Sequence, residues 1–253
     1  LQPQLPLKPA TKENHFRAEN TQLMLSYQKG QITLQQYKVL LFSLYEIYKA
    51  LEEELDRNSS HPAVAPIYFP QELARLESLE SDLEYFFGQD WEKRVIVPAA
   101  TQRYKQRLRK VGENENPELL VAHAYTRYLG DLSGGQVLGK ITQKSLGLSS
   151  KEGLSFFSFP GVSSPNRFKQ LYRSRMNSVE LTEEEKAAVL EEAVEAFELN
   201  IQVREQDSGL EVSDRPVRAS DVGAARFTAS PVLQFAVGLC VALATVGAAM
   251  YGM

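Results

Sequence analysis

The chain has 253 residues, enough for one sizeable domain with its own core. Its 28 basic and 32 acidic residues leave a formal net charge of −4, which argues against nucleic acid as a partner. The single cysteine, Cys240, excludes an intramolecular disulfide and any metal site built from clustered cysteines.

The N-terminal half predicts successive helices. Apolar residues over 10–30 recur near a helical period, and Gly30 is a natural residue just past a helix end. Thr33 and Gln36 have the spacing of a capping box, which predicts the start of a helix that runs to residue 58. A third segment, 69–88, has a proline in its first turn and ends at Gly88.

The following elements also read as helices. Asn116 as N-cap and Pro117 at the first helical position predict the start of a helical segment over 116–147. Two more helices are expected over 164–178 and 182–205, the second opened by a capping box of Thr182 and Glu185. The stretch RVIVP at 94–98 is too short to found a sheet. The fold class is therefore all-α.

The last fifth of the chain has a different composition. Residues 206–226 mix Ser, Asp, Gly, Pro and Arg without periodicity and are expected to form a flexible linker. The 22 residues of 232–253 carry no charge, and at about 1.5 Å per residue they can cross a bilayer core of roughly 30 Å. We therefore expect a helical domain over 1–205 and a C-terminal transmembrane anchor over 227–253, with the domain facing the cytosol. A buried core helix is the alternative for the last segment.

One stretch, YLGDLSGGQVLGK at 128–140, conflicts with its helical surroundings. It places glycines at 130, 134, 135 and 139, and each costs roughly 1 kcal/mol relative to alanine inside a helix. One explanation is close packing of two backbones. The other is a large flat ligand that lies against bare backbone. A phosphate-binding loop fits poorly, because that motif needs a preceding strand.

Other residues favour the ligand. His15 has Glu19 one helical turn later, where a carboxylate can orient an imidazole. Lys169 and Arg173 share one helix face and suit a ligand with carboxylates. Each signal alone is more often a solvated or structural side chain. One imidazole, a flat ligand on glycines and cations for two acidic tails together describe heme.

Several motifs make the chain similar to the eukaryotic heme oxygenases. The longest is LLVAHAYTRYLGDLSGGQ at 119–136, and ATKENH, ALEEELDRN, APIYFP and FKQLYRSRMNS match around it. The resemblance covers roughly residues 8–205 together with the tail anchor. Because the chain lacks the Cys-Pro motifs of the constitutive isoform, it resembles the inducible isoform more closely.

The resemblance implies a function for each of the residues above. His15 would bind the heme iron as the proximal ligand, and the glycine helix would cover the opposite, distal face. Asp131 would organise distal water and support proton delivery, with Arg127 and Tyr48 as catalytic partners and Tyr104 and Asn200 in the same network. The remaining heme-binding residues would be Lys8, Tyr125, Gly130, Gly134, Gly135, Lys169 and Arg173. Two departures stand out, which are Pro9 beside Lys8 and the glycine at 139, where relatives more often carry lysine.

The reaction implied is cleavage of heme b at a meso carbon, expected to be the α carbon, to biliverdin, ferrous iron and carbon monoxide. It would use O₂ and electrons from NADPH through cytochrome P450 reductase at the endoplasmic reticulum membrane, and biliverdin reductase would consume the product. A heme peroxidase is the alternative enzyme, although His123 lies about two turns before Gly130 and is poorly placed for peroxide cleavage. A heme sensor or carrier and a tail-anchored adaptor without heme are the alternatives outside catalysis.

Overall fold

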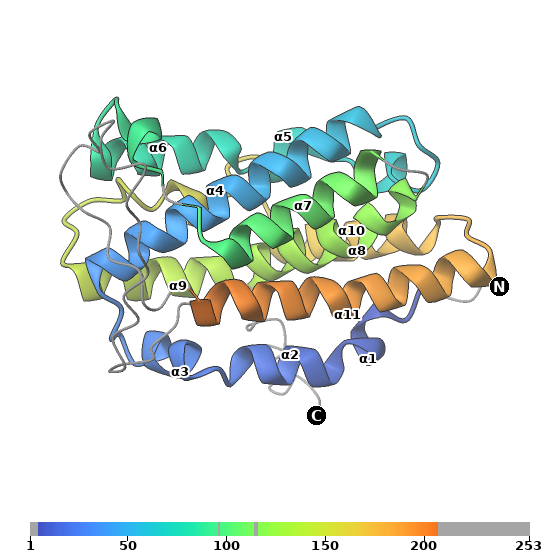
Figure 1. Ribbon diagram of the computed structural model, residues 1–253, viewed down its shortest axis with the longest axis horizontal. Helices are drawn as coiled ribbons and strands as arrows, with labels where there is room; N and C mark the ends of the chain where they lie inside the picture. The colour runs from blue at the N-terminus through green and yellow to red at the C-terminus, as the bar shows by residue number, and fades with distance from the viewer. Residues whose placement is uncertain (1–4, 96, 114–115, 207–253) are drawn as a thin grey trace.

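The computed structural model describes residues 5–206 except 96 and 114–115, and this part of the chain contains helices and no strands (Figure 1). The all-α prediction is confirmed for these residues. The helices are α1 (Leu7–Ala10), α2 (Lys12–Glu19), α3 (Gln22–Gln28), α4 (Leu34–Arg57), α5 (Pro70–Leu73), α6 (Leu76–Phe87), α7 (Ala99–Glu113), α8 (Leu120–Ala124), α9 (Gly130–Leu146), α10 (Pro165–Asn177) and α11 (Glu183–Gln206). Short 3₁₀ turns lie at Ala65–Ile67, Trp91–Arg94, Pro117–Leu119 and Ser155–Phe157.

Local capping signals set several helix ends as predicted. Thr33 accepts a hydrogen bond from the Gln36 amide while Gln36 accepts one from the Thr33 amide, which forms the capping box of α4. Thr182 and Glu185 form the same reciprocal pair at the start of α11. Gly30 has a φ of 72°, a left-handed conformation that glycine adopts without steric cost just past α3.

Other predicted helices are interrupted in the structure and form two or three shorter helices. The first segment becomes α1, α2 and α3, and α3 starts anew where the Thr21 hydroxyl accepts from the Met24 amide. The segment from 69 stops after α5, and α6 then starts where a carboxylate of α4, Glu52, accepts from the backbone amides of Arg75 and Leu76. Asn116 is the N-cap and Pro117 the first residue of the 3₁₀ turn Pro117–Leu119, as predicted, although the Asn116 side chain makes no capping hydrogen bond.

The core is built around α4. Sixteen of the 24 residues of this helix are buried, and it packs along α6 and α7, with α11 on the other side of α7 (Figure 1). Fully buried apolar side chains contribute about 1.5–3 kcal/mol each by leaving water. Helix α7 was not predicted because its sequence is rich in Lys, Arg and Gln, yet Tyr104, Leu108 and Val111 form a buried stripe at helical spacing.

Of the three N-terminal helices, only α2 lies outside this core, whereas Leu7 of α1 and Tyr27 of α3 belong to it. Figure 1 shows α1, α2 and α3 along one side of α11, away from α4 and α6. In α2 only Ala18 is buried, and it joins Phe197 and Ile201 of α11 in a small cluster separate from the main core. Contacts with α11 therefore determine the position of α2.

Within the described range, no helix is both long and apolar enough to cross a bilayer. The linker over 206–226 falls almost entirely, and the anchor over 227–253 entirely, outside the described residues. These predictions and the domain boundaries derived from them stay predictions.

Candidate heme-binding site

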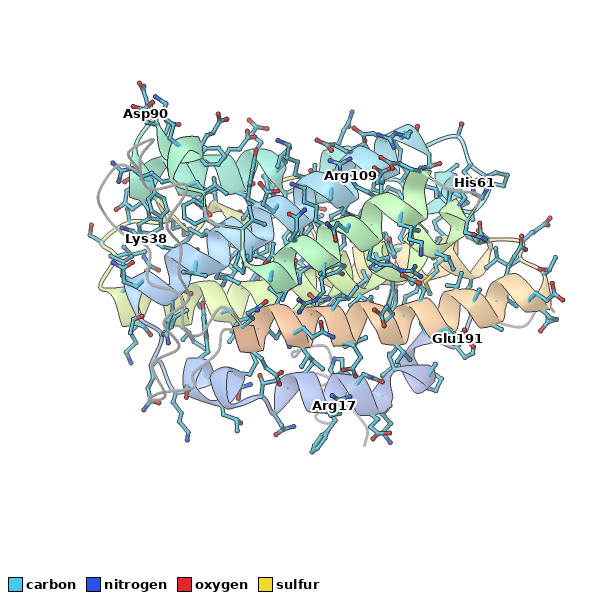
Figure 2. The ribbon with its side chains drawn as sticks, viewed as in Figure 1. Arg17, Lys38, His61, Asp90, Arg109 and Glu191 are labelled. Carbon is cyan, nitrogen blue, oxygen red and sulfur yellow. The ribbon has the colours of Figure 1, made fainter. Side chains whose placement is uncertain are left out.

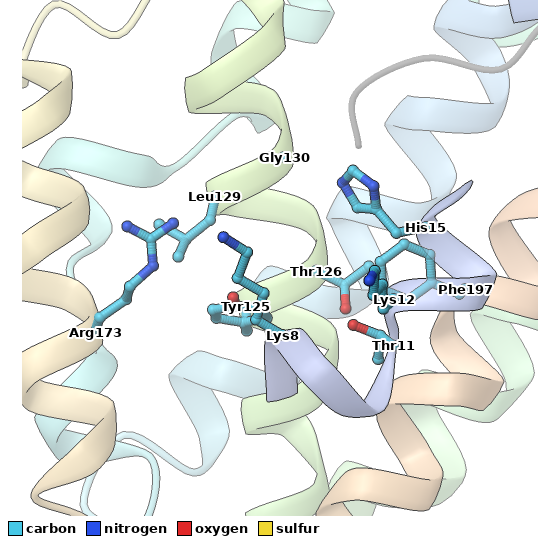
Figure 3. Close-up of a pocket in the computed structure, with 10 residues that line it drawn as sticks. All are labelled: Lys8, Thr11, Lys12, His15, Tyr125, Thr126, Leu129, Gly130, Arg173 and Phe197. Atoms are coloured by element: carbon cyan, nitrogen blue, oxygen red, sulfur yellow. The ribbon is translucent and has the colours of Figure 1, made fainter. Parts of the chain in front are cut away.

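A cavity of about 110 Å³ separates α2 from the long helical segment that contains α9 (Figure 3). His15 lines it from α2 and Gly130 from the start of α9, and Phe197 contributes from α11. Lys8 and Arg173 reach the opposite end of the cavity from His15, beside Tyr125 (Figure 3). The structure thus brings together five predicted site residues from separate segments of the chain.

His15 is oriented by two neighbours. Its Nδ1 lies 3.2 Å from Glu19 Oε1, the spacing predicted from one helical turn, although the two groups are not aligned as a hydrogen bond. Its ring meets the Phe197 ring edge-on, with 5.9 Å between centroids. Because Nδ1 lies beside the carboxylate, Nε2 is the nitrogen available to a metal.

The segment opposite His15 contains an irregular turn. Residues Tyr125–Leu129 form a π-helical turn between α8 and α9, and the backbone is regular α-helix from Gly130 to Leu146. The irregularity therefore precedes the glycines instead of arising at them. Such π turns often occur at functional sites, because one extra residue redirects the side chains on either side of it.

The glycines of α9 have different roles, and each of the two explanations offered by the sequence applies to only some of them. Gly130 lines the cavity. A Cβ on Gly139 would lie 3.0 Å from Phe157 Cβ, so this position serves close packing, whereas a Cβ on Gly135 would make an ordinary contact of 3.7 Å with the Phe157 ring. Gly134 is buried but is not among the cavity-lining residues. Ligand approach and backbone packing thus explain different members of the set.

Behind Gly130 lies a buried polar network centred on Asp131, whose side chain is 1% exposed. The Asp131 Oδ2 atom accepts from the Tyr48 hydroxyl, and from Arg127 Nη2 at 3.1 Å. Burial raises the pKa of Asp131 to about 6, although Arg127 and Tyr48 act to lower it. Its second oxygen, Oδ1, is buried without a hydrogen-bond partner in the protein. A buried acceptor of this kind fits a site completed by water or a ligand.

The network continues away from the cavity. Arg127 Nη1 donates to Asn200 Oδ1 at 2.7 Å, and Asn200 Nδ2 donates to the Tyr104 hydroxyl at 3.2 Å. These two residues therefore lie where the resemblance implied. His123 is completely buried near Tyr104, with Nε2 2.7 Å from Glu192, so it is a core histidine and does not line the cavity.

The cations predicted to bind the propionates do not all line the cavity. Lys8 sits in the short helix α1, which forms despite Pro9 because the backbone of Leu7 accepts from the Thr11 amide and hydroxyl. Lys169 lies one turn before Arg173 on α10 but does not line the cavity. Its pKa is lowered by burial and by the neighbouring Arg173.

Sequence reasoning missed other residues of the site. Lys12, Thr11, Thr126 and Leu129 also line the cavity. Lys12 lies one turn after Lys8, so the same spacing argument that singled out Lys169 and Arg173 could have found it. The two threonines and the leucine carry no signal of their own in the sequence.

The comparisons with known proteins agree with this geometry. The family model described as heme oxygenase matches residues 4–206. The chain belongs to the heme oxygenase family. It is 61% identical over 258 residues to a heme oxygenase of Takifugu rubripes, covering 98% of this chain and 93% of that protein. Human heme oxygenase 1 is 57% identical over 201 residues, covering 79% of this chain and 69% of the human protein.

Solved heme oxygenases share the fold. The crystal structure of heme oxygenase-1 from the cyanobacterium Synechocystis, in complex with heme, matches with a TM-score of 0.74 at 40% identity, over 78% of this chain and 87% of that one. The heme oxygenase of Leptospira interrogans matches with a TM-score of 0.71, also at 40% identity, over 76% of this chain and 93% of that one. This family membership identifies the chain as a heme-degrading enzyme.

Proposed function

We propose that heme binds between His15 and Gly130 and is opened at a meso carbon, the α carbon by expectation, to give biliverdin, ferrous iron and carbon monoxide. The observation that carries this proposal is the pairing of one imidazole with a bare glycine backbone across a single cavity. Heme is both substrate and cofactor, and when bound it supplies the iron that activates O₂ and the ring that is oxidised.

The residues of the cavity fit heme chemically. His15 offers one nitrogen to the iron, and Gly130 leaves room on the opposite face because it has no side chain. Lys8 and Arg173 can pair with the propionates at the far end, where the Tyr125 hydroxyl adds a donor. Asp131, with one carboxylate oxygen unpartnered, can hold a water beside the distal face.

Protons for the reaction would pass through Asp131. With a pKa of about 6, its carboxyl can bind and release a proton near neutral pH. Arg127 and Tyr48 fix Oδ2 by donating to it, so the free Oδ1 is the oxygen that can exchange protons with water. Arg127 stays charged, since its pKa is raised by Asp131 even though burial alone would lower it.

Electrons would come from NADPH through cytochrome P450 reductase, and biliverdin reductase would take the product. We further propose that residues 232–253 anchor the chain in the endoplasmic reticulum membrane with its helical domain in the cytosol. The support is the absence of charge over 22 residues. Sharing a membrane with the reductase raises the effective concentration of both proteins, so weak docking suffices. Alkaline extraction of microsomes tests the anchor, because a spanning segment stays in the pellet.

One experiment separates the functions considered. Hemin is added to the full chain in mild detergent, the Soret band is recorded, and ascorbate is then added under oxygen. A biliverdin spectrum and carbon monoxide release are expected. A heme spectrum that persists would indicate a carrier or sensor. Peroxide-driven oxidation of guaiacol without biliverdin would indicate a peroxidase, and no Soret shift would leave an adaptor.

A further inference from the structure

The helix that carries His15 is held to the rest of the protein mainly by polar contacts. Its one buried residue, Ala18, belongs to a three-residue cluster with α11 that is separate from the main core. Apolar burial therefore contributes little to its position. Polar bonds between α2 and α11 therefore add to the hold of the flanking helices α1 and α3, which Leu7 and Tyr27 anchor in the main core.

A single carboxylate of α11, Glu198, receives most of these bonds. Asn14 Nδ2 donates to Glu198 Oε1 at 2.7 Å. The Arg17 guanidinium donates to both carboxylate oxygens, with Nη2 3.2 Å from Oε2. This two-pronged geometry is the most directional ion pair available to proteins. A second tie lies at the end of the helix, where buried Arg204 of α11 donates to the Ala18 carbonyl at 3.0 Å.

The two donors to Glu198 flank the candidate iron ligand. Asn14 directly precedes His15 in the sequence, and Arg17 follows two residues later, so Glu198 fixes the short stretch of helix from which the imidazole projects. Figure 2 shows Arg17 on the side of the molecule formed by α2, below α11. The rotation of this stretch about its helix axis and its position relative to α11 determine where the His15 side chain points.

The cavity is too small for heme as it stands, so one of its walls has to move to admit the ligand. Its 110 Å³ is well below the roughly 300–1,000 Å³ typical of small-molecule sites, and heme is a large ligand. The opposite wall is continuous with the core through Asp131 and its buried partners. The wall formed by α2 buries little apolar surface, so it can move outward at a small cost in free energy.

We propose that Glu198 is a positioning residue that holds α2 against α11 as a latch. Release of this latch limits the rate at which heme enters the cavity and the rate at which the reaction product leaves it. The proposal rests on the heme-binding function proposed above. It concerns the rates of opening and the placement of His15, and assigns Glu198 no contact with the ligand.

The expected magnitudes distinguish a latch from a general stabiliser. The side chains of Arg17 and Glu198 are 51% and 29% exposed. An exposed pair of this kind changes an equilibrium by about two- to fivefold, and loss of the Asn14 bond adds a similar factor. Such factors are small beside the stability of the whole domain but large for the local opening of one helix.

The first test follows α2 directly in the heme-free full chain. Hydrogen–deuterium exchange of the 12–19 amides is compared between the wild type and Glu198→Ala. The control is Glu191→Ala, which removes an exposed carboxylate of the same helix that has no hydrogen bond or ion pair in the described part of the chain (Figure 2). We expect exchange over 12–19 to be about three- to tenfold faster in Glu198→Ala alone, with little change in α4. Unchanged exchange over 12–19 would overturn the latch.

The second test measures opening with heme present. Hemin-loaded protein is mixed with excess apomyoglobin, and heme transfer is followed in the Soret region. Glu198→Ala should raise the transfer rate about three- to tenfold, and the exchanged pair Arg17→Glu/Glu198→Arg should restore it towards the wild type. Faster exchange with an unchanged transfer rate would overturn the gating role. If no variant binds hemin while exchange still responds to Glu198, the proposed function fails and the latch stands.

Discussion

The two walls of the cavity are held by different means. The distal wall is formed by the π turn and by α9, which packs against the 3₁₀ turn Ser155–Phe157, and its buried Asp131 accepts hydrogen bonds from Tyr48 of α4 and from Arg127. The proximal wall, formed by α2, is peripheral and is held through a partly exposed carboxylate of α11. A substrate that must enter and a product that must leave need one wall that keeps its geometry and one that can open. The predictions below test this division.

The largest effect is expected at His15. The His15→Ala variant should lose measurable biliverdin formation, a greater loss than the 10–100-fold typical when a residue behind a metal ligand is changed. It should retain part of its hemin affinity, because the cations and Phe197 remain. Turnover with ascorbate and hemin titration measure the two quantities. Full turnover in this variant would remove His15 from the proximal position.

The next effect is expected on the opposite wall. The Asp131→Ala variant should bind hemin normally but form biliverdin about 100-fold more slowly, a reduction typical of losing a general acid–base group. With peroxide it should shift towards ferryl, peroxidase-like chemistry. Stopped-flow spectra with peroxide measure the partition between ring oxidation and this side reaction. Unchanged ring oxidation would contradict the role given to Asp131.

The same carboxyl predicts a pH dependence of stability. Its pKa is about 6 in the folded protein against 3.8 for an unperturbed aspartate, so between these values the folded state binds more protons than the unfolded state. The contribution of Asp131 to the free energy of unfolding should therefore fall as pH rises from about 4 to 6, by up to about 3 kcal/mol, and should stay constant above pH 6. Urea unfolding of the heme-free protein measures it. The Asp131→Asn variant should show a flatter profile, and an identical slope would contradict this assignment.

A smaller loss is expected where α9 packs on the core. In Gly139→Ala the new methyl group would lie 3.0 Å from Phe157 Cβ, closer than most carbon contacts. Such overpacking costs about 1–3 kcal/mol of stability, and the gain of roughly 1 kcal/mol from replacing a helical glycine by alanine offsets part of it, so a net loss of up to about 2 kcal/mol is expected. Thermal or urea unfolding measures the loss, and a second substitution, Phe157→Leu, should recover part of it. Equal stability of Gly139→Ala and the wild type would mean that Phe157 moves aside freely.

The smallest global effect is expected on the proximal wall. The Arg17→Ala variant should lose about 1 kcal/mol of unfolding free energy or less, as is usual for a half-exposed ion pair. Urea unfolding beside Gly139→Ala gives the comparison directly. If Arg17→Ala proved the more destabilising of the two, the proximal helix would be part of the core and the contrast between the walls would be lost.

Structural features that depend on residues close together in the chain could be predicted from the sequence. The capping boxes at Thr33 and Thr182 and the left-handed Gly30 involve neighbours three or fewer positions apart, so their patterns are visible in one window. Helix α7 was missed because its apolar stripe is narrow and most of its residues are charged or amide side chains.

Features decided by the tertiary fold could not be predicted. Glu198 and Asn14 are 184 positions apart, and nothing near either residue indicates the other. The glycines of α9 looked alike until the fold brought Phe157 against Gly135 and Gly139 and left Gly130 at the cavity. The imidazole and the propionate cations were found because the family motifs, not spacing alone, singled them out.

The π turn at Tyr125–Leu129 sets the angular phase of everything that follows it. A residue added to or removed from a helix rotates the downstream side chains by about 100°. Here Gly130 faces the cavity while the next residue, Asp131, faces the interior, so a one-residue deletion within the turn would rotate Asp131 towards the position that Gly130 occupies at the cavity. A substitution in this turn leaves the rotation of the downstream helix unchanged, so neighbouring side chains can compensate for it. A change in the length of the turn would instead rotate the groups of the polar network together and misalign them.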